Sequence, residues 1–144
     1  MAFVHRHRVR YRECDPMGVV YHAHLLDWFE AARTEALRAM GAPYKSLEER
    51  GLIMPVVEAT VRYHASLYYD DVAEIRVWFA EAPRVRLPLD YAVRREGDAV
   101  VCVSGRVTLC CVDTERRRPV PVPDEIRALA SHPLGRPPAA DAGD

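Results

Sequence analysis

One long apolar stripe followed by four alternating segments limits this chain to few architectures. Over residues 22–40, apolar side chains recur at spacings of three and four, which predicts a helix with one wide apolar face. Gly41 is a natural stop for this helix, and Pro43 follows it. Ahead of the helix, residues 3–12 alternate with a period of two, which favours a first strand. Its row of arginines is interpreted as a solvated or edge face, with phosphate binding as the alternative.

The segments after the helix show the period of two that is typical of half-buried strands. We expect strands at residues 56–67, 72–82, 84–95 and 99–112. A hairpin turn over residues 96–98 joins the last two. The first of these strands has one predicted apolar face, formed by Val57, Ala59, Val61 and Tyr63. Since one helix can cover the apolar face of an antiparallel sheet, the sequence predicts an α+β fold.

Shorter elements and a tail complete the expected organisation. The spacing of Ser46 and Glu49 is that of a capping box, which predicts a short helical turn there. Residues 124–130, after three prolines, can form a terminal helix. We therefore expect a single domain over residues 1–131 and a disordered tail over residues 132–144, where Pro, Gly, Ala and Asp dominate.

The composition argues against nucleic-acid and membrane partners. A formal net charge of −1 gives no general reason to expect nucleic acid. No apolar run approaches the ~20 residues of a transmembrane helix, and the first residues do not form a secretory signal. The cysteines lack C-x-x-C spacing, which favours free thiols in a reducing compartment; they are Cys14, Cys102, Cys110 and Cys111. A cytoplasmic location is the expectation.

The basic and amide residues are unusual in kind. Lys45 is the only lysine, and every other residue of the Lys and Arg set is arginine. The chain contains no Asn and no Gln. The loss of amide side chains is typical of proteins from thermophiles, whereas the arginine excess can also reflect codon composition. We therefore hypothesise a thermophilic source.

The run from Asp15 to His22 carries the strongest chemical signal. It places a carboxylate and the turn residue Gly18 just before the start of the long helix. No Ser, Thr, Asp or Asn lies between Met17 and His24, so this helix start lacks the preferred N-cap side chains. Its free N–H groups carry roughly +0.5 of an elementary charge and can donate hydrogen bonds to an external acceptor or to water. For Asp15 the alternatives are a catalytic carboxylate facing an oxyanion site and an Asx-turn or cap in the loop.

The other reactive side chains are weaker candidates for catalytic or metal-binding roles. Cys14 has no histidine partner implied by its local spacing, so it is interpreted as a small packed hydrophobe rather than a nucleophile. His22 and His24 would face different ways on a helix and make a poor metal pair. The chain has no H-x-x-x-H, G-x-S-x-G, P-loop or G-x-G-x-x-G sequence. We expect neither a metal nor a cofactor.

The same run, with the segment from Trp28 to Arg33, resembles the signature of the 4-hydroxybenzoyl-CoA thioesterase-like hotdog family. Within that family the chain most resembles the acyl-CoA thioesterases associated with the Tol–Pal system. The similarity extends roughly from residue 9 to residue 129 and includes Tyr63, residues 69–71, 90–94 and 119–125. The resemblance implies a hotdog fold, with five antiparallel strands wrapped around one long central helix. It also implies homodimers or dimers of dimers (homotetramers), with active sites at subunit boundaries.

The resemblance further implies an acyl-CoA substrate and assigns roles to the residues of the run. Asp15 matches the essential aspartate of the family, as nucleophile or as general base. The His22 backbone N–H matches the oxyanion donor, and Gly18 would allow the substrate to approach closely. Tyr21 is expected to contact substrate.

The resemblance places CoA-phosphate contacts roughly at Arg84, Arg86 and the loop of Arg116, Arg117 and Arg118, because guanidinium groups pair well with phosphate. A solvated charged loop is the alternative for each. Two departures concern the acyl group: His24-Leu25 stands where relatives commonly have Asn-Tyr, and Ala65-Ser66 replaces a common Arg/Lys-Pro pair.

The expected function is hydrolysis of short- or medium-chain acyl-CoA, ahead of aromatic acyl groups. The alternative from another class is a noncatalytic acyl-CoA-binding or regulatory hotdog protein, since fold does not determine function. A hotdog dehydratase would need a His/Asp or His/Glu pair across the dimer, which the sequence alone does not show.

Overall fold

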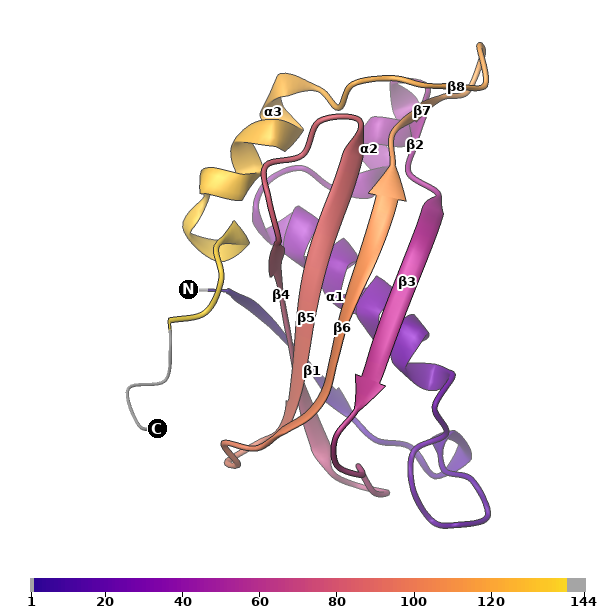
Figure 1. The fold of residues 1–144 in the computed structure, drawn as a ribbon, viewed down its shortest axis with the longest axis vertical. Helices are drawn as coiled ribbons and strands as arrows, with labels where there is room; N and C mark the ends of the chain where they lie inside the picture. The colour runs from indigo at the N-terminus through magenta and orange to yellow at the C-terminus, as the bar shows by residue number, and fades with distance from the viewer. Residues whose placement is uncertain (1, 140–144) are drawn as a thin grey trace.

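The structure is a computed structural model that describes residues 2–139. Its main sheet has five antiparallel strands in the order β1-β4-β5-β6-β3 (Figure 1). The strands are β1 (Phe3–Arg8), β3 (Val56–Tyr63), β4 (Val72–Phe79), β5 (Arg86–Arg95) and β6 (Val101–Cys110). The five predicted strands are confirmed, although each is shorter than the periodicity suggests.

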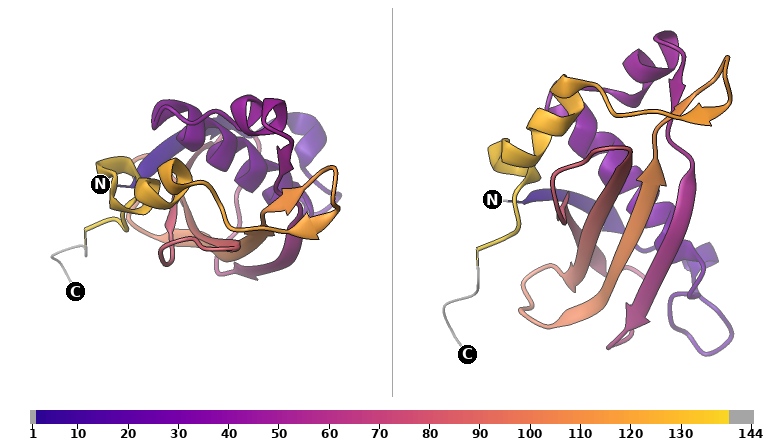
Figure 2. Two further views of the ribbon diagram at one scale, coloured as in Figure 1. Left: turned by 90° about the horizontal axis from the view of Figure 1, so that it is seen from above. Right: turned by 45° about the horizontal axis from the view of Figure 1, so that its top comes forward.

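Helix α1 (His24–Ala39) covers one face of this sheet, as the view from above shows (Figure 2). The helix has 16 residues and begins two positions after the predicted start, because residues 22 and 23 still belong to a turn. Its buried face consists of Leu25, Trp28, Phe29, Ala32, Ala36 and Leu37. The predicted stripe is thus confirmed as the face that meets the sheet, while Met40 lies at the C-cap, half-buried.

Close contact between helix and sheet depends on one strand glycine. Phe29 is fully buried and stacks on Tyr91 of β5, with ring centroids 4.2 Å apart. Gly105 of β6 pairs with Tyr91, and a Cβ at position 105 would lie 2.7 Å from the Phe29 ring and 2.8 Å from the Thr60 carbonyl oxygen. The missing side chain therefore makes room for the aromatic pair.

Strand β3 differs from its predicted burial. Its alternation predicts one buried face, yet seven of its eight residues are exposed, including Val57 and Tyr63, which are 48% and 51% exposed. The reason is position: β3 is the last strand of the sheet, paired with β6 on one side alone. Period-two patterning identifies a strand but does not say where in the sheet it lies.

Two predicted boundaries move because of local contacts. The first strand ends at Arg8 rather than at residue 12, since a 3-10 turn (Tyr11–Glu13) follows, in which the Glu13 carboxylate accepts a hydrogen bond from the Arg10 N–H. The Ser46 capping box is wrong. Helix α2 (Tyr44–Glu49) starts earlier, after Pro43, and no side chain caps it.

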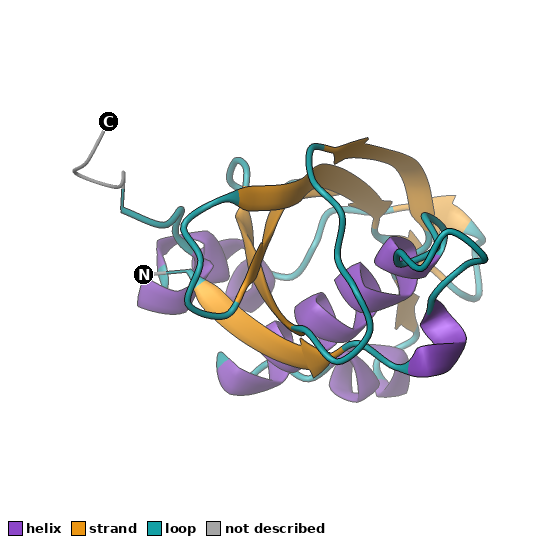
Figure 3. Ribbon diagram, turned by 90° about the horizontal axis from the view of Figure 1, so that it is seen from below, coloured by secondary structure: helices purple, strands orange, loops and turns teal. Residues whose placement is uncertain are grey.

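The sequence does not predict the small second sheet or the 3-10 turns that follow the terminal helix. The second sheet joins β2 (Leu52–Ile53), β7 (Val112–Asp113) and β8 (Arg118–Pro119). The terminal helix is confirmed as α3 (Asp124–Arg127), and two 3-10 turns continue from it, Ala128–Ser131 and Pro133–Gly135 (Figure 3).

Residues 133–135, which belong to the expected tail, form one of these 3-10 turns. Gly135 is buried against Phe79 of β4, and a Cβ there would lie 2.2 Å from the Leu129 carbonyl oxygen. The last five residues of the predicted tail, 140–144, lie outside the described residues. All four cysteines are free thiols, as predicted. Within residues 2–139, no helix is long and apolar enough to cross a membrane.

Candidate active site

Asp15 lies in a tight hairpin formed by residues 13–21, called here the Asp15 hairpin. Its two arms are joined by hydrogen bonds from the Tyr21 N–H to the Glu13 carbonyl (2.8 Å) and from the Asp15 N–H to the Val19 carbonyl (2.9 Å). At the tip, the Gly18 N–H bonds the Asp15 carbonyl at 2.9 Å, and Gly18 has φ of +80°. Asp, Pro and Gly at the first, second and fourth positions favour this turn, and a glycine in the left-handed region lets the arms pair.

The Asp15 carboxylate is held by its own loop. Its Oδ1 accepts a hydrogen bond from the Met17 N–H at 2.9 Å, which is the Asx-turn that the sequence offered as one alternative. Within the described residues, Oδ2 has no hydrogen-bond partner, so the Asx-turn leaves one oxygen available. Holding one oxygen and leaving the other open is compatible with the catalytic alternative.

The turn just before α1 provides an unpaired donor beside this hairpin. No side chain caps the helix, as predicted from the lack of N-cap residues. The His22 N–H has no hydrogen-bond partner among the described residues, whereas the His24 N–H already bonds the Tyr21 carbonyl at 3.1 Å. The helix dipole places partial positive charge at this end, so a developing oxyanion would be stabilised there.

Asp15 and His22 line one cleft of about 290 Å³. The cleft lies between the Asp15 hairpin, the start of α1 and the end of β3, with Val103 of β6 contributing one wall. Much of the lining is apolar, from Met17, Val19, Val20, Leu25, Ala65, Leu67 and Val103, and its other polar groups are Tyr63, His64 and Ser66. An acyl chain could pack against such walls while a thioester carbonyl meets the polar end.

Tyr63 lines the cleft, although the sequence predicts it only as part of a strand face and of the family resemblance. Its hydroxyl donates a hydrogen bond to the His22 carbonyl at 2.8 Å, which ties the end of β3 to the helix start. Burial raises the pKa of this phenol. The sequence does not show that Tyr63 lies at the end of an edge strand, and it contains no local signal for the hydrogen bond between Tyr63 and His22.

Glu13, at the base of the Asp15 hairpin, is the other residue that sequence reasoning missed. It is 8% exposed, and its carboxylate bonds the Arg10 N–H, the His7 ring and the Trp28 indole N–H at 2.7–2.8 Å. Burial alone would raise the pKa of Glu13, but these donors outweigh it and hold the pKa below its usual range. The carboxylate is thus ionised at neutral pH.

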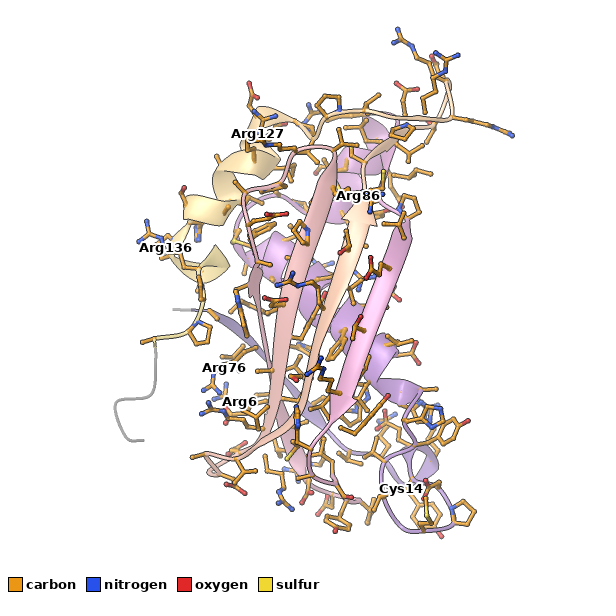
Figure 4. All side chains as sticks on the ribbon, in the orientation of Figure 1. Arg6, Cys14, Arg76, Arg86, Arg127 and Arg136 are labelled. Atoms are coloured by element: carbon orange, nitrogen blue, oxygen red, sulfur yellow. The ribbon has the colours of Figure 1, made fainter. Side chains whose placement is uncertain are left out.

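The remaining predicted residues are not all brought to the cleft. Gly18 supplies the turn but does not line the cleft, and Tyr21 is 44% exposed, packed on the His22 ring at 4.4 Å between centroids. Cys14 does not line it either. Figure 4 places Cys14 and Arg86 at opposite ends of the molecule.

The predicted CoA-binding arginines therefore lie far from Asp15 within one chain. Arg84 and Arg86 flank a groove at the β4–β5 turn, and Arg116 and Arg117 lie in the β7–β8 hairpin. Among residues 2–139, no three His, Cys, Asp or Glu side chains gather as a metal site. What the cleft can do with its own groups is to present a carboxylate and an N–H donor to a carbonyl compound.

Comparisons with known proteins identify the family of the chain. The sequence profile described as the thioesterase-like superfamily matches residues 9–129. The chain is 31% identical over 126 residues to an acyl-CoA thioesterase of Haemophilus influenzae, covering 87% of this chain and 91% of that protein. It is 31% identical over 121 residues to a 1,4-dihydroxy-2-naphthoyl-CoA hydrolase of Thermosynechococcus vestitus, covering 83% and 82%. The crystal structure of a hypothetical protein from Thermus thermophilus has a TM-score of 0.81 and 36% identity, covering 89% of this chain and 96% of that one.

Proposed function

The chain belongs to the thioesterase-like superfamily, and from this membership we propose that it hydrolyses short- or medium-chain acyl-CoA with Asp15 as the reacting carboxylate. The resemblance seen in residues 15–22 is thereby confirmed, and so is thioester hydrolysis as the class of reaction. One observation supports the assignment of residues: Asp15 lines the same cleft as His22, whose backbone N–H has no hydrogen-bond partner among the described residues.

Two routes use the same groups. In the first, an Asp15 oxygen attacks the thioester carbonyl carbon, the C–S bond breaks, CoA leaves as the thiolate, and water hydrolyses the resulting anhydride. In the second, Asp15 removes a proton from a water whose oxygen attacks the carbonyl carbon; the C–S bond then breaks, and the leaving CoA thiolate takes up that proton. In both, the carbonyl oxygen gains negative charge beside the His22 N–H, and one such donor is typically worth about 10²–10³ in rate.

A panel of acyl-CoA thioesters tests the substrate class. We expect kcat/KM, followed by release of the free CoA thiol, to be highest for short or medium aliphatic chains, because the cleft walls are mainly aliphatic side chains. Benzoyl-CoA and 1,4-dihydroxy-2-naphthoyl-CoA serve as aromatic comparisons. Faster hydrolysis of an aromatic thioester would contradict the acyl preference, and binding of CoA esters without turnover would contradict the enzymatic function.

A homodimer through β3 would complete the site. The exposed β3 edge leaves a row of backbone N–H and C=O groups unpaired, which is a template for pairing with another strand. Antiparallel pairing of two copies about a two-fold axis sets the Tyr63 end of one β3 beside the Val56 end of the other. That second end lies next to Arg86 and the β7–β8 hairpin, since β3 follows β2 and Arg86 pairs with Cys110. The arginines of each copy would then serve the cleft of its partner.

Subunit mixing tests this proposal. One variant carries Asp15→Asn, and the other carries alanine in place of Arg84, Arg86, Arg116 and Arg117. If the site forms between copies, a 1:1 mixture of dimers regains about a quarter of wild-type kcat/KM, because half of the dimers are mixed and each has one intact site. If the arginines serve their own cleft, mixing restores nothing. Sedimentation of the wild type checks that a dimer or a dimer of dimers exists.

A further inference from the structure

We propose that Glu13 is a positioning residue for hydrolysis: its carboxylate holds the Asp15 hairpin against α1, so that Asp15 and the His22 N–H keep their relative placement. The inference rests on the proposed function, because it concerns the efficiency of the same cleft.

Glu13 is the only buried polar or charged residue in the described part of the chain. Both of its carboxylate oxygens are engaged: Oε1 accepts from the Arg10 N–H (2.7 Å) and contacts the His7 Nε2 (2.8 Å), and Oε2 accepts from the Trp28 Nε1–H (2.7 Å). These partners come from β1, from the turn after it and from α1. One side chain thus joins the three segments that meet at the base of the Asp15 hairpin.

The backbone of Glu13 is tied to the other arm of the hairpin. Its carbonyl accepts the Tyr21 N–H at 2.8 Å, opposite the bond between the Asp15 N–H and Val19. Asp15 follows Glu13 by two residues, and His22 follows Tyr21 by one. A shift of Glu13 therefore moves the reacting carboxylate and the oxyanion donor together with respect to α1.

A packing role alone does not require a charge at this position. Removing a carboxylate from water is unfavourable, and an apolar side chain of similar volume often packs at least as well. The charge does provide acceptors for three donors in fixed directions, and Trp28 adds rigidity by packing on the His7 ring, with centroids 4.7 Å apart. Such rigidity affects the reaction rate by keeping the reacting groups in place, because a displacement of about 1 Å can lower the rate 10²-fold.

The test is Glu13→Gln, which preserves shape. The Arg10 N–H and the Trp28 indole N–H can only donate, but glutamine has one acceptor oxygen, so its NH₂ group must face one of these donors. We expect kcat for acyl-CoA hydrolysis to fall about 10- to 100-fold, with KM within about twofold, at a temperature well below unfolding. Glu125→Gln, the same change in an exposed pair with Arg50, is the matched control and should leave kcat unaltered.

A second variant separates positioning from folding. In Glu13→Gln/Trp28→Phe the indole donor is gone, so the glutamine can direct its oxygen to the Arg10 N–H without a clash of donors. We expect kcat several-fold above that of Glu13→Gln alone, whereas a merely structural role predicts a further loss. If Glu13→Gln does not fold, Trp28→Phe alone carries the test, with kcat expected to fall about tenfold at unchanged KM.

The outcomes distinguish this inference from the proposed function. If Asp15→Asn abolishes hydrolysis while Glu13→Gln or, failing that, Trp28→Phe retains wild-type kcat, positioning by Glu13 is overturned and the function stands. If the wild type hydrolyses no acyl-CoA, the proposed function itself fails.

Discussion

Asp15→Asn should lower kcat for acyl-CoA hydrolysis by at least about 10²-fold, because general acid–base catalysis typically contributes about 10²–10⁴ and loss of a nucleophile can cost more. An amide neither attacks the carbonyl as a carboxylate does nor removes a proton from water at neutral pH. The fold should survive, because the amide oxygen can still accept the Met17 N–H that the carboxylate accepts at 2.9 Å. KM should change little, since the acyl-binding walls and the His22 N–H are untouched.

The chain offers a closely matched control for this substitution. Asp98 makes the same kind of Asx-turn, with its Oδ1 accepting the Val100 N–H at 2.9 Å, but it lies in the β5–β6 hairpin and not in the cleft. Asp98→Asn should retain full activity. The two variants are compared by steady-state kinetics, followed by thiol release, and by circular dichroism to check folding. Near-wild-type turnover by Asp15→Asn would refute the role of Asp15.

Gly105→Val should lower the free energy of unfolding by about 3 kcal/mol, at the upper end of the range for overpacked cores. The first added carbon already meets the Phe29 ring at 2.7 Å and the Thr60 carbonyl oxygen at 2.8 Å. Phe29 cannot retreat easily, because it is fully buried and stacked on Tyr91. The change thus separates α1 from the centre of the sheet, and urea unfolding curves measure its cost.

Thr108→Val places valine on the other face of the same strand, where it replaces a side chain of similar size. Thr108 lies three residues further along β6 and is half-buried, in register with Pro88 and Glu58. Surface changes of this kind alter stability by about 0.5 kcal/mol or less. If Gly105→Val were equally mild, the close approach of α1 at Gly105 would not be a determinant of stability.

Local patterns were enough for the elements and for the turn that carries Asp15. The period of the apolar residues predicts α1 and the five strands, and the Asp-Pro-x-Gly order predicts the reversal at Gly18. The lack of a side-chain cap at the helix start was also predictable, because capping depends on the few residues next to it. In each case the interacting groups are near one another in sequence.

Contacts between distant segments had to come from the tertiary structure. The order of the strands makes β3 an edge and leaves its predicted apolar face exposed, although its sequence alternates as in β4. The hydrogen bonds between Glu13 and Trp28 and between Tyr63 and His22 join segments whose local sequences do not indicate these contacts.

The amino-acid sequence by itself therefore determines which groups lie near Asp15 within its loop, because backbone dihedral angles and turn preferences act over a few residues. Which groups face Asp15 across the cleft, and how far the predicted arginines lie from it, depended on strand order and helix packing. Strand order and helix packing are determined by how all segments bury their apolar surfaces together, so they cannot be predicted from any single segment.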